Sequence, residues 1–99
     1  MNYNTYHIFF RNLANPLKIK IITELKTKSL TVTELTNKIK EEQSKVSHAL
    51  ANLRFCNLVI SETKGKQRVY SLNKDTILPI LKIIDNHKGI YCKGGCNAK

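Results

Sequence analysis

The segment from Gln43 to Arg54 has the sequence QSKVSHALANLR, which has the spacing of a helix with two different faces. Its apolar side chains recur three and four residues apart and form one narrow stripe: Val46, Leu50 and Leu53. Hydrogen-bonding side chains occupy most of the remaining surface: Ser44, Lys45, Ser47, His48 and Asn52. Short polar groups and a cation near a helix N-terminus can reach base edges and phosphates in the major groove of DNA. The segment therefore predicts a DNA-reading helix, although an ordinary amphipathic surface helix would show the same pattern.

The residues before this segment predict a short helix and a tight turn. Thr31-Val32-Thr33-Glu34 fits a capping box, in which the Thr and Glu side chains satisfy unpaired backbone amides at the start of a helix. That helix carries Val32, Leu35 and Ile39, and the polar break Lys40-Glu41-Glu42 follows it. A short helix, a brief turn and a longer helix form a helix-turn-helix unit.

The residues after the segment predict a hairpin. The long helix is expected to end near Asn57-Leu58, and strands are expected at 59–62 and 67–72. The turn between them contains Gly65, which can adopt positive φ. This two-stranded β-wing has a basic tip that suits phosphates or a minor groove, carried by Lys64, Lys66 and Arg68. A solvated hairpin tip is the alternative.

Three further helices are expected: one at the start of the chain, a second directly after it, and one near the end. Tyr3 to Leu13 is apolar around much of a helical circumference, and so is the last helix, from Asn73 to about His87. This breadth favours burial against a second subunit. Asn15-Pro16 predicts a cap and first turn for the second helix. Pro79 lies either in the first turn of the last helix or at a kink.

Composition limits the class of protein. The 99 residues suffice for one domain, and 17 Lys and Arg against 7 Asp and Glu give a formal net charge of +10. That charge favours a polyanionic partner, of which nucleic acid is the first choice and an anionic membrane surface the alternative. No apolar run approaches a membrane span and no signal-peptide pattern is present, so we expect a cytoplasmic protein with reduced cysteines. We expect no enzyme, because no phosphate-binding loop or catalytic motif is found.

Four motifs in this order resemble the ArsR/SmtB family of winged-helix repressors, over roughly Phe9 to His87. Leu13-Ala14-Asn15-Pro16-Leu17-Lys18-Ile19-Lys20-Ile21-Ile22 is similar to the family's opening L-x-x-P-x-R-x-x-I-L, with Lys18 where Arg is usual. The segment 43–53 is similar to its recognition helix, Q-x-x-V-S-H-H-L-x-x-L. Asn57-Leu58-Val59 resembles G-L-V with Asn in place of Gly, and 68–72 resembles the return strand of the wing.

The resemblance implies an α+β, mostly α, winged helix-turn-helix fold of about five helices and a two-stranded wing. It implies a homodimer joined through the first and last helices, a palindromic double-stranded DNA operator and repression of transcription. The recognition helices would lie in successive major grooves, roughly 34 Å apart. Positions that match the motif become candidate DNA contacts: Gln43, Ser44, Lys45, Ser47 and His48. We expect the folded domain at 1–88 and a flexible tail at 89–99. A winged helix used only for protein–protein contact remains the alternative.

Family metal sites match this sequence incompletely. Thr31 and Thr33 stand where one such site has cysteines, and hydroxyls do not replace thiolates for soft ions. Asp85-Asn86-His87 matches the first half of another site, but Ala98 stands where its next ligand is expected.

The tail offers a different set of donors. Cys92 and Cys96, with His87 and Asp85 or a residue of a second subunit, could build a tetrahedral Zn(II) site. Thiolates would also suit As(III), Cd(II) or Cu(I), and the two could instead form a redox-sensing disulfide or do neither. Cys56 is expected to be a small buried residue, and His7 an interface or solvated histidine.

Overall fold

A computed structural model describes residues 3–90 of the chain as five helices and three short strands, which confirms the winged helix-turn-helix fold. The tail residues 91–99, with Cys92 and Cys96, lie outside the described residues. The elements in chain order are α1 (Tyr3–Leu13), α2 (Pro16–Leu25), β1 (Leu30–Thr31), α3 (Val32–Ile39), α4 (Gln43–Phe55), β2 (Val59–Lys64), β3 (Gln67–Leu72) and α5 (Ile77–Ile90).

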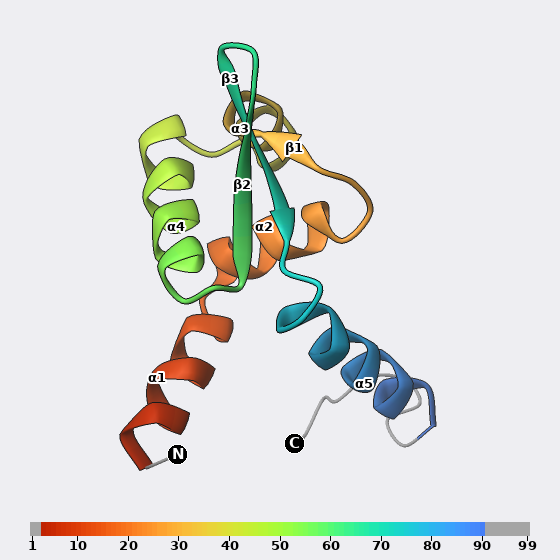
Figure 1. Cartoon of the computed structure of the whole chain (residues 1–99). Helices are drawn as coiled ribbons and strands as arrows, with labels where there is room; N and C mark the ends of the chain where they lie inside the picture. The colour runs from red at the N-terminus through yellow and green to blue at the C-terminus, as the bar shows by residue number, and fades with distance from the viewer. Residues whose placement is uncertain (1–2, 91–99) are drawn as a thin grey trace.

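Helices α2, α3 and α4 and the sheet form one packed body, which we call the head (Figure 1). Its core is apolar, and the stripe predicted from the sequence lies in it: Val46, Leu50 and Leu53 are at most 1% exposed. Ala49 joins that stripe. Buried partners come from every other element of the head, among them Ile21, Leu35, Val59 and Leu72. Helix α4 is therefore held by the hydrophobic effect along one side only.

Local hydrogen bonds set where the helices of the head begin. The Asn15 side chain accepts the backbone N–H of Lys18 at 3.0 Å, as expected for the cap of α2. At α3 the capping box is complete, since the Thr31 hydroxyl accepts from Glu34 N–H and the Glu34 carboxylate accepts from Thr31 N–H. The second of these bonds holds the pKa of Glu34 below its ordinary value. This contribution to stability is present at neutral pH and is lost as the pH falls through the lowered pKa.

Helix α4 ends slightly earlier than the sequence predicted. Helix α4 stops at Phe55, Cys56 caps it, and Asn57 turns the chain toward β2 with φ of +60°. Left-handed backbone is costly for most side chains, but Asn tolerates it. The family motif has Gly at this position, and the conformation explains how Asn57 can replace it.

The sheet has one strand more than predicted. Strands β2 and β3 form the wing, and Gly65 adopts positive φ at its tip as expected. The short strand β1 pairs antiparallel with β3, with Leu30 opposite Tyr70 and Thr31 opposite Val69, so that the order is β1-β3-β2. Two residues are too few to show an alternating pattern in the sequence. This extra pairing fixes the base of the wing to the start of α3.

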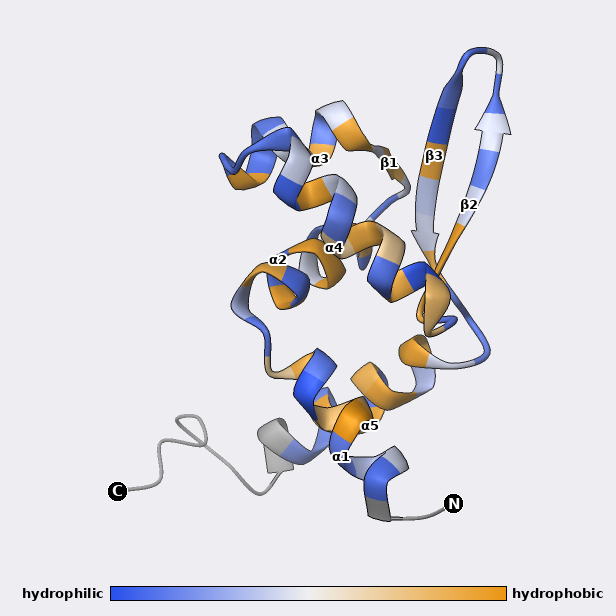
Figure 2. Ribbon diagram, turned by 90° about the vertical axis from the view of Figure 1, so that its left-hand side faces the viewer, coloured by the Kyte–Doolittle hydropathy of each residue, from blue (hydrophilic) through white to orange (hydrophobic). Residues whose placement is uncertain are grey.

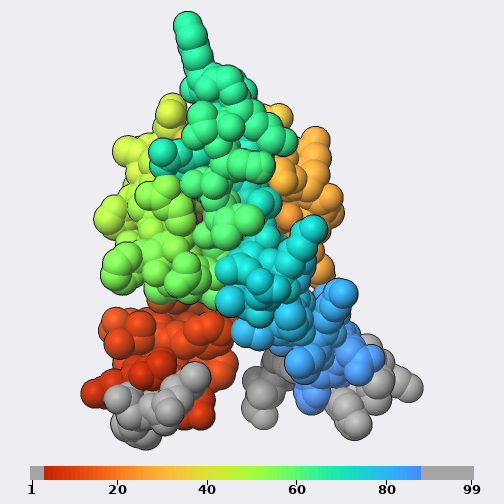
Figure 3. Space-filling model, viewed as in Figure 1, coloured from red at the N-terminus to blue at the C-terminus, as the bar shows by residue number. Residues whose placement is uncertain are grey.

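The outer helices α1 and α5 lie at the end of the molecule opposite the wing tip (Figures 1 and 3). Helix α5 begins at Ile77, not at Asn73, because residues before it form a turn in which the Asn73 side chain accepts from Asp75 N–H. Pro79 falls in its first turn, where no amide is needed. The helix continues through Gly89 to Ile90, beyond the predicted end near His87. Within residues 3–90, no helix has the length and apolarity needed to cross a bilayer.

Replacing Thr31 with Ala removes the hydroxyl that caps α3. We expect Thr31→Ala to lower the free energy of unfolding by about 1 kcal/mol, measured by urea denaturation. Thr33→Ala, at an exposed position in the first turn of the same helix, is the matched control. Equal losses in the two variants would contradict the assignment of the effect to the cap.

Candidate nucleic-acid interface

The polar face of α4 is exposed over its full length. Five of the six residues predicted on this helix are exposed and Asn52 is half-buried, so the structure brings all six together on one helix: Gln43, Ser44, Lys45, Ser47, His48 and Asn52. The turn before α4 depends on Lys40, which adopts left-handed φ of 62° and ends α3. Packing of α3 against α4 then fixes the direction in which this face points.

Neighbouring elements flank the helix on two sides. Figure 2 shows α4 between α2 and the wing. On the wing side, the Arg54 guanidinium lies 3.4 Å from the hydroxyl of Ser61 in β2. On the α2 side, Lys45 and Asn52 stand close to the first turn of α2, with Leu17 and Ala49 beneath them. The exposed face therefore has a central strip farthest from the core, which we call the crest, and two flanks, one toward α2 and one toward the wing. Different residues occupy each.

The wing extends the cationic surface away from the head. Lys64, Lys66 and Arg68 are all exposed, and Thr63 pairs with Arg68 and Lys64 with Gln67 in the antiparallel register. The hairpin projects beyond the rest of the molecule in the space-filling view (Figure 3). Its cations can therefore contact a partner that is also in contact with α4.

The charges of this surface have little internal compensation. Lys45 Nζ lies 4.0 Å from Glu41 Oε1, at the outer limit of an ion pair. Among the residues that the structure describes, no polar or charged side chain is buried, so the excess of cations lies on the surface. A basic, exposed helix face beside a basic hairpin suits a polyanion with grooves.

Comparison with known proteins finds relatives that match the region from α2 to β2. The model of the bacterial regulatory protein arsR family matches residues 15–61, from the cap of α2 into β2. The arsenical resistance operon repressor of Bacillus subtilis is 35% identical over 77 residues, which cover 77% of this chain and 73% of the relative. The chain belongs to the ArsR family. The matched members are named as transcriptional regulators, which supports the expectation that the chain is not an enzyme.

Two further similarities extend the ArsR assignment. The HTH-type transcriptional regulator NmtR of Mycobacterium tuberculosis is 41% identical over 69 residues, covering 70% of this chain and 58% of NmtR. The chain thus spans less than two thirds of that relative's length. The solution structure of apo-NmtR superposes with a TM-score of 0.75 and 31% identity, covering 97% of this chain and 81% of that one.

The predicted metal ligands are only partly placed. Asp85 forms an ion pair with Lys26 at the end of α2, with 2.5 Å between Nζ and Oδ2. Both side chains are about half exposed, so the pair contributes only about 0–1 kcal/mol. His87 is exposed on α5, whereas Cys92 and Cys96 lie outside the described residues. Within the described part of the chain, no three His, Cys, Asp or Glu residues form a group that could hold a metal ion.

Cys56 was predicted to be buried, and that prediction is wrong. The thiol is exposed at the end of α4 and accepts a hydrogen bond from Asn12 Nδ2 of α1 at 3.3 Å. The backbone carbonyl of Asn57 next to it accepts from the side chains of Asn73 and Thr76, at 2.9 and 2.8 Å. We call residues 56 and 57 with these partners the joint, because it ties α1 and the turn that leads into α5 to the head. These contacts join residues 16 to 44 positions apart, so no sequence motif indicates them.

Proposed function

We propose that this protein is a sequence-specific DNA-binding repressor of transcription that acts as a homodimer in the cytoplasm. The observation that carries the proposal is the position of the exposed polar face of α4 beside a cationic wing on one body. A surface of this kind suits duplex DNA in shape and in charge. Membership in the ArsR family supports the same function.

Helix α4 would enter the major groove, where some of its exposed residues would contact base edges and others the sugar–phosphate backbone. Ser44, Ser47 and His48 near the crest are short or planar hydrogen-bonding side chains suited to base edges, and Gln43 opens the same face. Lys45 and Asn52 on the α2 flank would lie near the sugar–phosphate backbone. Lys64, Lys66 and Arg68 of the wing would contact phosphates or the adjacent minor groove.

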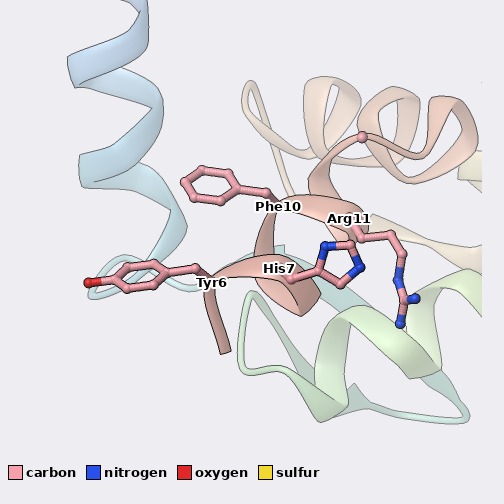
Figure 4. A pocket seen from close by; sticks show the side chains of 5 residues that line it. Tyr6, His7, Phe10 and Arg11 are labelled. Carbon is pink, nitrogen blue, oxygen red and sulfur yellow. The ribbon is translucent and has the colours of Figure 1, made fainter. Parts of the chain in front are cut away.

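The outer helices present an apolar surface that suits a second copy of the chain. Tyr6 and Phe10 of α1 are 52% and 61% exposed, and Ile83 of α5 is 70% exposed. Figure 4 shows Tyr6 and Phe10 on one side of α1 and His7 and Arg11 on the other. Phe10 shares one apolar hollow with Ile80 and Ile84 of α5. A partner that covers these residues would place two α4 helices on one palindromic operator.

We further propose that the C-terminal thiols sense the signal that releases the repressor. Cys92 and Cys96 follow the last helix in sequence, and their thiolates suit Zn(II) or another thiophilic ion, or a disulfide. The described residues do not complete a metal site on their own, because no three possible ligands lie together among them. Asp85 is paired with Lys26. The proposal for a metal therefore depends on the thiols, with His87 and Asp85 as secondary ligands.

Removing single side chains separates base contacts from phosphate contacts. We expect Ser47→Ala or His48→Ala to weaken binding to the specific site by about 1–3 kcal/mol and binding to scrambled duplex much less. Lys64→Ala or Lys66→Ala should weaken both and lower the salt dependence. Fluorescence anisotropy with duplex DNA from upstream of the gene measures both. No binding of the unaltered protein to duplex DNA would favour a protein–protein module instead.

A charge on the apolar surface of the outer helices should separate the subunits. We expect Phe10→Asp and Ile83→Asp each to raise the dissociation constant of the dimer about 30-fold or more, as for a central interface residue worth about 2 kcal/mol. Analytical ultracentrifugation measures this constant. Ile60→Asp, on an exposed residue of the wing, is the control and should leave it unchanged. A monomeric unaltered protein would contradict the assembly.

Loss of both tail thiols should remove the response to an effector. In the reduced protein, we expect Zn(II), Cd(II), Cu(I) or As(III) to weaken DNA binding by roughly 5–150-fold, the usual range of coupling between sites. Cys92→Ser with Cys96→Ser should abolish this change, whereas Cys56→Ser should keep it. A response that survives loss of the two tail thiols would locate the sensor elsewhere.

A further inference from the structure

A basic hollow lies between the reading helix and the start of α2. It has a volume of about 410 Å³ and is lined by Asn15, Leu17, Lys18, Lys45, His48, Ala49 and Asn52. Two lysines and a histidine line it, and none of these lining residues is acidic. Lys18 belongs to no motif assigned to DNA contact, and the resemblance to the family marks it only as a basic residue at that position. We call this feature the α2–α4 hollow.

The hollow lies on the flank of α4 that faces α2. His48, Ala49 and Asn52 lie three, four and seven residues after Lys45, so they follow one side of the helix, and His48 stands where this flank borders the crest. Arg54 and its partner Ser61 mark the opposite side, toward the wing. A helix with its side chains is about 10–12 Å wide and the major groove is about 12 Å wide, so both flanks of a seated helix approach the bordering backbones.

A hydrogen bond holds Lys18 at the edge of the hollow. Its Nζ donates to Asn12 Oδ1 of α1 at 2.8 Å, and this bond fixes a side chain that is half-buried. An ammonium group has three N–H donors, so two remain after that bond. Its cationic neighbour in the hollow, Lys45, is 60% exposed and only 4.0 Å from Glu41, a distance at which a stronger anion can replace the carboxylate.

We propose that the α2–α4 hollow binds one backbone phosphate of the DNA that borders the groove occupied by α4, with Lys18 and Lys45 as its cations. This proposal rests on the proposed DNA-binding function and adds a contact from outside the helix-turn-helix and the wing. Two cations meeting one phosphate would fix how far α4 slides along the groove. Phosphate contacts of this kind set register and orientation, not base preference.

Salt dependence of DNA binding tests the hollow. The probe is a fixed 30-base-pair duplex, and the affinity of each variant is measured by anisotropy between 50 and 200 mM salt. One phosphate contact adds about 0.9 to the steepness with which log K falls against log salt, a factor of about 3.5 over this fourfold range. Because Lys45 remains in the hollow, Lys18→Met should lose part of that factor per bound subunit, and Lys18→Met with Lys45→Met should lose all of it. Affinity for specific and scrambled duplexes should fall by the same factor.

Matched variants separate this role from a structural one. Asn12→Ala removes the hydrogen bonds of Asn12 with Lys18 and with Cys56 but keeps the Lys18 cation, so it should leave the slope unchanged. Lys18→Arg keeps a cation at position 18 and should retain the slope of the unaltered protein. A second probe set replaces one phosphate at a time with neutral methylphosphonate. One such position in each half-site should weaken the unaltered protein more than it weakens Lys18→Met, and it should leave Lys18→Met with Lys45→Met unaffected.

The outcomes are distinguishable. If the unaltered protein binds duplex DNA but Lys18→Met keeps its full slope, the hollow does not hold a phosphate and the proposed function stands. The same holds if Lys18→Met and Asn12→Ala lose affinity equally with an unchanged slope, which would make Lys18 a structural tie between α1 and α2. If the unaltered protein binds no duplex DNA, the proposed function fails and this inference fails with it.

Discussion

Burial of one side of α4 is the constraint on which the rest of the structure depends. Val46, Ala49, Leu50 and Leu53 face the core, and together they determine which residues of the helix remain in solvent. A rotation of the helix by one residue, about 100°, would bury polar side chains without hydrogen-bond partners. The hydrophobic effect thus orients the exposed polar face of α4, although the buried residues themselves would contact no base.

This arrangement separates stability from function. In the part of the chain that the structure describes, the buried residues are hydrophobic and none is charged, while all the candidate DNA contacts are exposed or half-buried on the surface. Surface substitutions of this kind usually change stability by less than about 0.5 kcal/mol. The reading residues can therefore change with the DNA site while the fold is kept, which is how one scaffold can serve many operators.

Local rules predicted most of the fold, and contacts between distant residues account for the differences. The caps at Asn15 and Thr31 and the apolar stripe of α4 depend on neighbours within four residues, so the sequence alone indicates them. The strand β1, the exposure of Cys56 and the pairing of Lys26 with Asp85 depend on partners many positions away. The α2–α4 hollow likewise depends on distant residues, because Lys18 and Lys45 line one hollow only once α2 packs against α4.

The joint at the end of α4 gives the molecule a mechanical property. Asn12 reaches Cys56 from α1, and Asn73 and Thr76 reach the Asn57 carbonyl from the loop before α5, so both outer helices hold the head at one end of α4. That end is a fulcrum, and the 13 residues of α4 form a lever about 20 Å long. A turn of about 10° there moves the other end by about 3.5 Å, slightly more than the length of one hydrogen bond. A slight change in how two outer helices meet would be enough to move Gln43 and Ser44, two of the proposed DNA contacts, out of hydrogen-bond range of a base edge.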